Sequence, residues 1–230
     1  MPLIQIEDVS KTYSSNGTAV RALDRVSLAV EEGEMVALMG PSGSGKSTLL
    51  SILGAMNPPT DGSLTVDGID VYGLSGERRA DFRHTYLGFV FQQLQLVPYL
   101  TAIENVMLPL AITRHSHKEQ TRMAVDALAR VGLADKVDRL PSQLSGGEQE
   151  RVAIARALVN APPIILADEP TGSLDTQTGD EVMRTLQQLN EAGQTIVVVT
   201  HNPDNTRYVQ RVVRIRDGRI VPEASPVIGS

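Results

Sequence analysis

Residues 40–47 of this chain have the sequence Gly40-Pro41-Ser42-Gly43-Ser44-Gly45-Lys46-Ser47, which fits the phosphate-loop pattern G-x-x-x-x-G-K-[ST]. The apolar run Met35–Met39 before it predicts a buried strand, and the segment that begins at Thr48 predicts a helix. In that setting, backbone N–H groups and the helix N-terminus surround a polyphosphate. Lys46 is expected to reach the β- and γ-phosphates, and the Ser47 hydroxyl to bind magnesium. A Gly-rich hairpin turn is the alternative, but the flanking strand and helix favour a nucleotide-phosphate site over residues 40–48.

The composition excludes several classes of protein. The 230 residues are enough for one large domain or for a core with a subdomain, and 41% hydrophobic with 21% charged residues is typical of soluble globular proteins. A net charge of -6 and an aromatic content of 3% argue against a nucleic-acid partner, which usually needs basic excess and stacking aromatics. Cysteine is absent, which excludes disulfides, thiol catalysis and cysteine metal sites and is compatible with a reducing cytosol.

The apolar runs are too short to cross a bilayer. The N-terminal segment Met1–Asp8 has no basic region and no long apolar region, so we expect no secretory signal. Runs such as Ile164–Ala167 and Ile196–Val199 are far shorter than the roughly 20 residues that a transmembrane helix needs. If the protein works at a membrane, another chain is expected to supply the spanning part.

Alternating runs and turn residues predict an α/β architecture. Leu3–Val9 and Val20–Val30, separated by the turn-like Ser14–Gly17, predict a small antiparallel sheet. Further strands are expected at residues 63–67, 69–72, 87–91, 164–167 and 195–200, a strand pair at 212–220, and a helix at 176–192 that Gly193 ends. Because strands alternate with helices in the core, we expect a parallel sheet covered on both faces.

A helical insert is expected to interrupt this core. Ser116–Glu119 fits a capping box, and the apolar face of the helix that follows ends at Gly132. That face comprises Met123, Ala127, Leu128 and Val131. The fold class is therefore a P-loop NTPase in a single domain, 1–230. Residues 1–92 and 161–230 form its nucleotide-binding core with the antiparallel β-subdomain, and residues 93–160 form a helical subdomain. The last several residues are expected to be a loose tail.

Two carboxylates follow the predicted strand Ile164–Ala167. Asp168, at the carboxyl end of a strand next to the phosphate loop, is suited to hold the magnesium shell. Glu169 is then placed to polarise a water for in-line attack on the γ-phosphate, as a general base. The alternative is a pair of surface acids at a strand end, which the four aliphatic residues before them and the phosphate loop disfavour.

A second anion-binding helix end is predicted at Leu144-Ser145-Gly146-Gly147-Glu148. Ser145 stands at a helix start and is followed by the unshielded N–H groups of Gly146 and Gly147. A Gly-broken turn before a helix is the alternative. One triphosphate does not need two phosphate-binding ends on the same chain.

With the phosphate loop and Asp168-Glu169, this segment resembles the ATP-binding-cassette (ABC) ATPase subunits over essentially the whole chain. The signature of that family is usually written LSGGQ, and Glu148 replaces the commoner Gln here. The resemblance implies that Ser145, Gly146, Gly147 and Glu148 bind the ATP of a second copy. Two ATP molecules, each with Mg2+, would then lie within a head-to-tail dimer.

Three further positions match the pattern of the family. Tyr13 lies where the family stacks an aromatic ring on adenine, although a lone tyrosine there would more often be packed. Gln92 resembles the glutamine that senses magnesium and the attacking water, so the resemblance implies a catalytic and metal-binding role beside Ser47 and Asp168. His201, after a β-rich strand, resembles the switch histidine that contacts the γ-phosphate. Without the resemblance, Gln92 and His201 would be an ordinary polar residue and an ordinary histidine.

Ser173-Leu174-Asp175 resembles the loop that crosses the dimer interface, and Asp175 is also a plausible helix N-cap. Three other histidines have no counterpart in the pattern, and we expect them to be solvated: His84, His115 and His117.

The branch that this chain resembles is the lipoprotein-release and macrolide-export type, on residues 88–93, 104–106 and 166–172. The resemblance implies an ATPase on the inner face of the cell membrane that drives a separate integral-membrane permease. Contact with the permease is expected through a groove near the insert that Leu94–Leu100 lines. Packing of that segment between insert and core is an equal alternative.

Three other functions are compatible with parts of the sequence. The first is a cassette of the cell-division or signalling type that regulates a membrane partner without moving a substrate. The second is a soluble cassette that acts on DNA or ribosomes, which the acidic balance and the single cassette disfavour. The third is a small-molecule kinase, which would leave residues 144–148 without a role.

Overall fold

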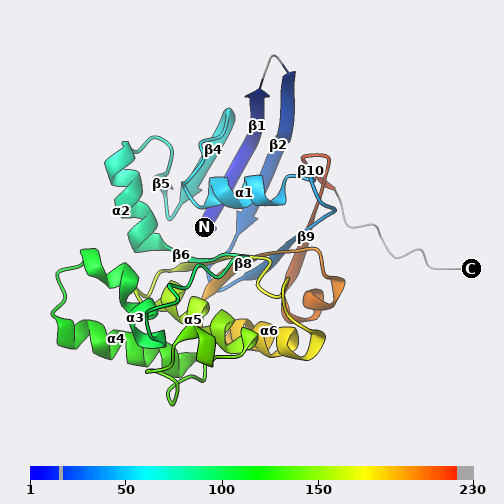
Figure 1. The fold of residues 1–230 in the computed structure, drawn as a ribbon. Helices are drawn as coiled ribbons and strands as arrows, with labels where there is room; N and C mark the ends of the chain where they lie inside the picture. The colour runs from blue at the N-terminus through cyan, green and yellow to red at the C-terminus, as the bar shows by residue number, and fades with distance from the viewer. Residues whose placement is uncertain (16–17, 222–230) are drawn as a thin grey trace, which may run out of the picture.

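The structure, a computed structural model, describes residues 1–15 and 18–221, and its centre is a six-stranded sheet (Figure 1). The strand order is β10-β9-β3-β8-β7-β6, and all neighbours are parallel except β9 and β10. The strands are β3 (Met35–Met39), β6 (Leu87–Val90), β7 (Ile164–Asp168), β8 (Thr195–Thr200), β9 (Arg211–Arg216) and β10 (Arg219–Val221). Every residue of β3 and β8 is buried, as expected of parallel strands covered on both faces.

A second, antiparallel sheet confirms the predicted β-subdomain. Its order is β2-β1-β4-β5, formed by β1 (Ile4–Ser15), β2 (Thr18–Val30), β4 (Asp61–Val66) and β5 (Ile69–Asp70). The strand expected at residues 69–72 is therefore only two residues long. The predicted turn Ser14–Gly17 and the predicted C-terminal tail lie partly or wholly outside the described residues, at 16–17 and 222–230.

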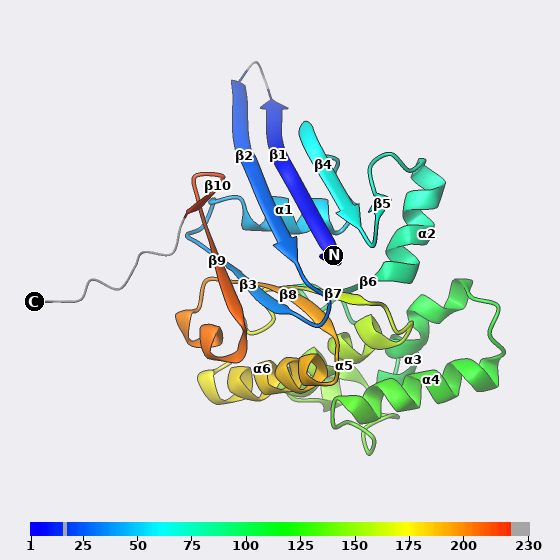
Figure 2. The same cartoon turned by 180° about the vertical axis from the view of Figure 1, so that it is seen from behind.

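The two faces of the central sheet are covered by different secondary-structure elements (Figures 1 and 2). Ile164 and Leu166 of β7 belong to the core shared with α1 (Lys46–Leu53) and the antiparallel sheet. Ile165 and Ala167 belong to the core shared with the other helices, since successive strand residues face opposite sides. Those helices are α3 (Ala102–Met107), α4 (His117–Arg130), α5 (Gly146–Leu158) and α6 (Thr176–Glu191).

The capping signals in the sequence place the helix ends correctly. Ser116 and Glu119 form the predicted capping box, in which the Ser116 N–H donates to the Glu119 carboxylate at 2.7 Å. α4 ends before Gly132, which has a φ of 73°. Asp175 caps α6 by accepting a hydrogen bond from the Thr178 N–H at 3.0 Å. Gly193 after α6 has a φ of 98°, as expected of a residue that ends a helix.

Helix α2 (Gly76–Tyr86) has no counterpart among the predicted elements. Only Phe82 of this helix is buried, so the sequence has no apolar stripe with helical spacing. The local signals are the N-cap Ser75 and the acidic Glu77 in the first turn. The part of the chain that the structure describes also contains three short 3-10 helices: Leu108–Ile112, Pro141–Gln143 and Pro203–Tyr208. Within the described residues, no helix is both long and apolar enough to span a membrane.

Candidate active site

The phosphate loop joins β3 to α1 as predicted, and its glycines are required by the backbone around them. Gly45, the N-cap of α1, has a φ of 108°, and a Cβ there would lie 2.5 Å from the Ala22 carbonyl oxygen. A Cβ on Gly40 would overlap the Ile215 carbonyl oxygen. No side chain caps α1. Its first N–H groups therefore remain available to an anion, in a helix end that carries partial positive charge.

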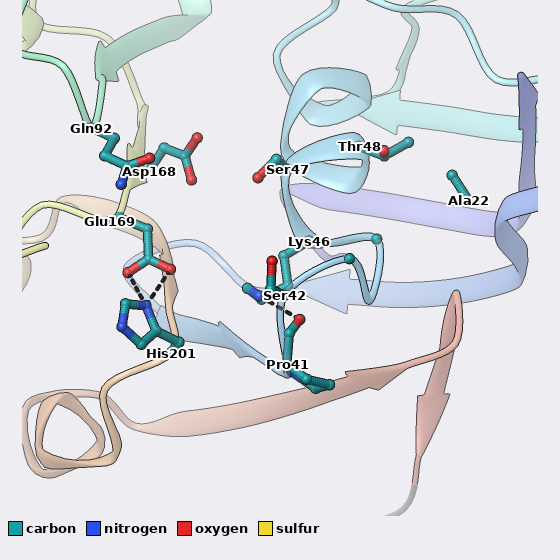
Figure 3. Close-up of a pocket in the computed structure, with 12 residues that line it drawn as sticks. Ala22, Pro41, Ser42, Lys46, Ser47, Thr48, Gln92, Asp168, Glu169 and His201 are labelled. Carbon is teal, nitrogen blue, oxygen red and sulfur yellow. Dashed lines mark hydrogen bonds and ion pairs between the residues drawn. The ribbon is translucent and has the colours of Figure 1, made fainter.

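The loop forms one wall of a cavity of about 620 Å³ that brings together five separate segments (Figure 3). Opposite the loop lie Gln92 after β6, Asp168 and Glu169 at the end of β7, and His201 after β8. The whole lining is Ala22, Pro41, Ser42, Gly43, Gly45, Lys46, Ser47, Thr48, Gln92, Asp168, Glu169 and His201. Gln92, Asp168 and His201 lie at the carboxyl ends of the neighbouring parallel strands β6, β7 and β8, which is where α/β sheets bind ligands.

Lys46 lies largely buried at the floor of the loop. Its ammonium group donates to the carbonyl oxygens of Gly40 at 2.7 Å and Pro41 at 3.0 Å. Gly40 and Ser44 are the two predicted loop residues that do not line the cavity. Ser44 is buried and its hydroxyl has no hydrogen-bond partner among the described residues.

The two carboxylates differ in their surroundings although they are adjacent. Both oxygens of Glu169 lie 2.9 Å from Nδ1 of His201, and Glu169 has a left-handed φ of 50° while its N–H donates to the Val199 carbonyl. Asp168 is half-buried, and its Oδ1 has no partner among the described residues. Burial raises the pKa of Asp168, the Glu169 charge raises it further, and Lys46 opposes both.

The unpartnered Asp168 oxygen is compatible with a metal ligand. Ser47 and Gln92 line the same cavity, and Figure 3 shows Asp168 between Gln92 and Ser47. A hydroxyl, an amide oxygen and a carboxylate are oxygen ligands of the kind that Mg2+ prefers. No cluster of three or more His, Cys, Asp or Glu side chains suited to a metal occurs within residues 1–15 and 18–221.

The second predicted anion-binding end, at the start of α5, does not line this cavity. Ser145 is the N-cap, and its N–H donates to the Glu148 carboxylate at 2.7 Å while its hydroxyl accepts from the Glu148 N–H at 3.2 Å. The hydrogen bond from the Ser145 N–H is the main cause that lowers the pKa of Glu148. Gly146 is exposed, whereas Gly147 is buried and a Cβ on it would overlap Cγ2 of Thr178. Gly146 and Gly147 thus differ in exposure, and the expectation that both of their N–H groups are unshielded stays a prediction.

Tyr13 lies outside the residues that line the cavity. It is 44% exposed, its hydroxyl accepts from Asn57 at 2.7 Å, and the Lys11 ammonium lies 5.3 Å from its ring centroid. Ala22 lines the cavity but was not predicted, because a lone alanine in a strand carries no signal.

His84 corrects another expectation. It is half-buried rather than solvated, and its Nδ1 lies 3.2 Å from the Asn160 side chain. His115 and His117 are exposed, as expected.

The family profile described as "ABC transporter" matches residues 23–172. The chain belongs to the ABC transporter family. An uncharacterized ABC transporter ATP-binding protein of Thermotoga maritima is 50% identical over 218 residues, which cover 95% of this cassette and 93% of that protein. The macrolide export ATP-binding/permease protein MacB of Syntrophobacter fumaroxidans is 49% identical over 230 residues. These cover 99% of this cassette but only 32% of that protein, so the chain spans about a third of the relative's length.

Solved structures agree with the cassette fold. The cassette MJ0796, a protein of Methanocaldococcus jannaschii, was solved as a dimer in a post-hydrolysis state bound to ADP and Pi, with a TM-score of 0.85 and 44% identity. That match covers 95% of this chain and 97% of the other. cbiO1 from Clostridium perfringens, part of the transporter complex cbiONQ, has a TM-score of 0.87 at 28% identity, over 96% of this chain and 87% of the other. The α/β core, the antiparallel subdomain and the helical insertion predicted from the sequence are thus those of an ABC ATPase.

Proposed function

We propose that two copies of this cassette bind two Mg-ATP molecules head to tail and hydrolyse them to drive a separate membrane permease of the export type. The observation that carries the proposal is the separation of the two phosphate-binding ends. The loop before α1 lines a cavity with Glu169 and His201, whereas Ser145 at the start of α5 does not. A second copy would supply its own Ser145 end to complete the site.

In this proposal, the phosphate loop and Lys46 hold the triphosphate, with Thr48 and the other loop residues around it. Magnesium bound by Ser47, Gln92 and Asp168 would neutralise charge on the phosphate oxygens. Lys46 would exchange its two carbonyl partners for phosphate oxygens, since charge-assisted hydrogen bonds are the stronger ones.

Glu169 acts as the general base in the proposal. Its carboxylate would take a proton from the attacking water at Oε1 or Oε2. His201 holds the Glu169 carboxylate at 2.9 Å and, as the sequence resemblance implies, would turn toward the γ-phosphate when the dimer closes. Closure would be a population shift driven by γ-phosphate contacts that only the closed dimer makes. Tyr13 would stack on the adenine at the edge of the site.

The proposed contact site for the permease is a groove of about 420 Å³ that α2, β6 and α5 line. It is lined by Met56, Ala80, Arg83, His84, Leu87, Gly88, Phe89, Phe91, Pro109, Arg156, Ala157 and Asn160. The segment Leu94–Leu100, expected to line such a groove, does not, and Leu96 packs against the core instead. A partner at this groove would keep the cassette on the cytoplasmic face of a membrane.

The names of the relatives favour export over regulation, because the macrolide export proteins share 44–49% identity with this chain. A cassette that regulates a membrane partner without moving a substrate is the alternative. Co-purification with a candidate permease, followed by a substrate-extraction assay in vesicles, separates the two.

Glu169→Gln tests the proposal directly. The variant keeps the shape of the side chain but cannot take a proton, so turnover should fall by about 10²–10⁴-fold while ATP binding remains. With hydrolysis blocked, a dimer should accumulate in ATP on a sizing column and disappear in ADP. Normal turnover would show that Glu169 is not the base, and a monomer in ATP would contradict the shared site.

A further inference from the structure

Arg156 ties the helix that begins at the signature to the segment that follows Gln92. From the last turn of α5, its guanidinium donates to the carbonyl oxygens of Leu94 at 2.6 Å and Gln95 at 2.8 Å. The two bonds leave from different nitrogens, so the planar fork grips two successive carbonyls. Such a grip fixes orientation as well as distance.

The gripped backbone is strained. Gln95 has a φ of 49°, in the left-handed region that non-glycine residues rarely occupy. Strain of this kind persists only where the surroundings impose it. Arg156 binds the carbonyl of that same residue, and it is therefore in place to impose the conformation.

The far end of the segment is held separately. Asn105 of α3 is fully buried and binds both backbone groups of Val97, with its Oδ1 accepting from the N–H at 2.7 Å and its amide donating to the carbonyl at 3.1 Å. It also donates to the carbonyls of Leu100 and Thr101. Phe91 follows β6. Between Phe91 and Val97, the two bonds from Arg156 are the side-chain hydrogen bonds that hold the backbone within the described residues.

The charge of Arg156 is balanced by these carbonyls. Burial lowers the pKa of Arg156, and the nearest carboxyl that opposes this effect is Glu150 on the same helix. Burial raises the pKa of Glu150 to about 8, so Glu150 is mostly protonated at neutral pH. The half-buried guanidinium charge is therefore stabilised by the carbonyl dipoles of Leu94 and Gln95. The segment fixes the position of the Arg156 side chain, and the side chain in turn fixes the segment.

We propose that Arg156 is a positioning residue for Gln92: by clamping residues 94–95, it fixes where the Gln92 side chain stands in the nucleotide cavity. The inference rests on the proposed function, since it assumes that Gln92 takes part in hydrolysis. Gln92 lies two residues before the clamp and lines the cavity opposite Ser47.

A double-mutant cycle on the full-length purified cassette tests this role. Arg156→Gln should lower the kcat for ATP by about tenfold while the ATP dissociation constant changes by less than about twofold. Gln92→Ala should also lower kcat, and the double variant should be no worse than Gln92→Ala within about twofold. Arg156→Lys, which can serve one carbonyl, should recover part of the loss. The control Arg130→Gln removes an exposed arginine from α4 and should leave kcat unchanged.

If the loss of kcat in the double variant equals the product of the two single losses, the inference is overturned but the proposed function stands. A wild-type kcat for Gln92→Ala would instead contradict the role of Gln92 itself. Should Arg156→Gln fold poorly, hydrogen exchange on Arg156→Lys decides. Faster exchange confined to residues 93–97 supports the clamp, and exchange that rises throughout α5 or nowhere contradicts it.

Discussion

The N-termini of α1 and α5 are both predicted to bind phosphate, but they are capped differently in the structure. α1 begins after Gly45 with no side-chain cap, and its end faces a cavity. α5 begins after Ser145 with a complete capping box, and Glu148 accepts the hydrogen bond of the Ser145 N–H. The first end therefore leaves its N–H groups uncapped beside the cavity, as the proposed phosphate site requires. The second already carries a carboxylate and is stable by itself.

This difference favours the α1 end as the one that binds a nucleotide alone in the proposed dimer. The α1 end has Lys46 and several loop N–H groups, whereas the α5 end offers Ser145 and the exposed Gly146 next to a negative charge. The α5 end should therefore bind a phosphate that another site already holds. Variants at the two ends should separate binding from turnover.

The largest expected effect is on turnover, at the α5 end. Ser145→Arg should lower ATP hydrolysis by about 10²-fold or more, because bulk and a lost hydroxyl would block the shared site. ATP affinity of the single chain, measured by equilibrium titration, should remain within about twofold. Ser142→Arg, at an exposed position just before the signature, is the matched control. An equal fall in affinity and turnover would contradict a site divided between two copies.

At the α1 end the effect should fall on affinity instead. Lys46→Ala removes one charge-assisted partner of the phosphates and should weaken ATP binding by about 10–100-fold. Lys118→Ala, on the exposed first turn of α4, should bind ATP normally. Unchanged affinity for Lys46→Ala in the same titration would refute the interpretation of the phosphate loop.

The two signature glycines should differ in stability. Gly147→Ala places a Cβ against Thr178 Cγ2, and such overpacking costs about 1–3 kcal/mol in the free energy of unfolding. Gly146→Ala meets only Leu174 Cδ2 at 3.1 Å, the end of a flexible side chain, and should cost less. Thr178→Ser removes the clashing methyl but keeps the hydroxyl that donates to Asp175, so it should rescue Gly147→Ala in urea unfolding. Failure of the rescue would exclude this contact as the cause.

The smallest expected effect concerns two carboxyls near the start of α5. Burial raises the pKa of Glu150 to about 8, above its unfolded value of 4.5. The folded protein therefore binds more protons than the unfolded chain between pH 4.5 and pH 8, and the free energy of unfolding falls as pH rises through this range. Glu150→Gln stays neutral and should therefore gain stability over the native chain as pH rises from 5 to 8, by about 1 kcal/mol or more at pH 8.

The contribution of Glu148 to stability depends on pH in the opposite direction. Its pKa is lowered, so its contribution is present above pH 4.5 and is lost as pH falls through the folded pKa. The advantage of Glu148 over Glu148→Gln should shrink in acid. Urea unfolding at pH 4, 5, 6.5 and 8 measures the difference in free energy of unfolding between each variant and the native chain. A difference for Glu150→Gln that does not change with pH would contradict burial of a protonated carboxyl.

Local patterns were sufficient for most of the fold and for the parts of the site that are continuous in sequence. The strand, Gly-rich loop and helix around Lys46 follow from neighbouring residues, and capping signals placed the starts of α4, α5 and α6. α2 was missed because a helix with one buried residue has no apolar period. Gln92 and His201 were found only through the resemblance to a family.

The amino-acid sequence alone was therefore sufficient to predict the two helix ends that we propose to bind phosphate, since their chemistry depends on backbone conformation within a few residues. Only the tertiary structure decided that Gln92, Glu169 and His201 share a cavity with the first end and that the second end lies apart from it. It also decided that Gly147 serves packing and that Arg156 holds residues 94–95. The physical reason is that these contacts join residues from different strands and helices, and sheet order and helix packing bring those together.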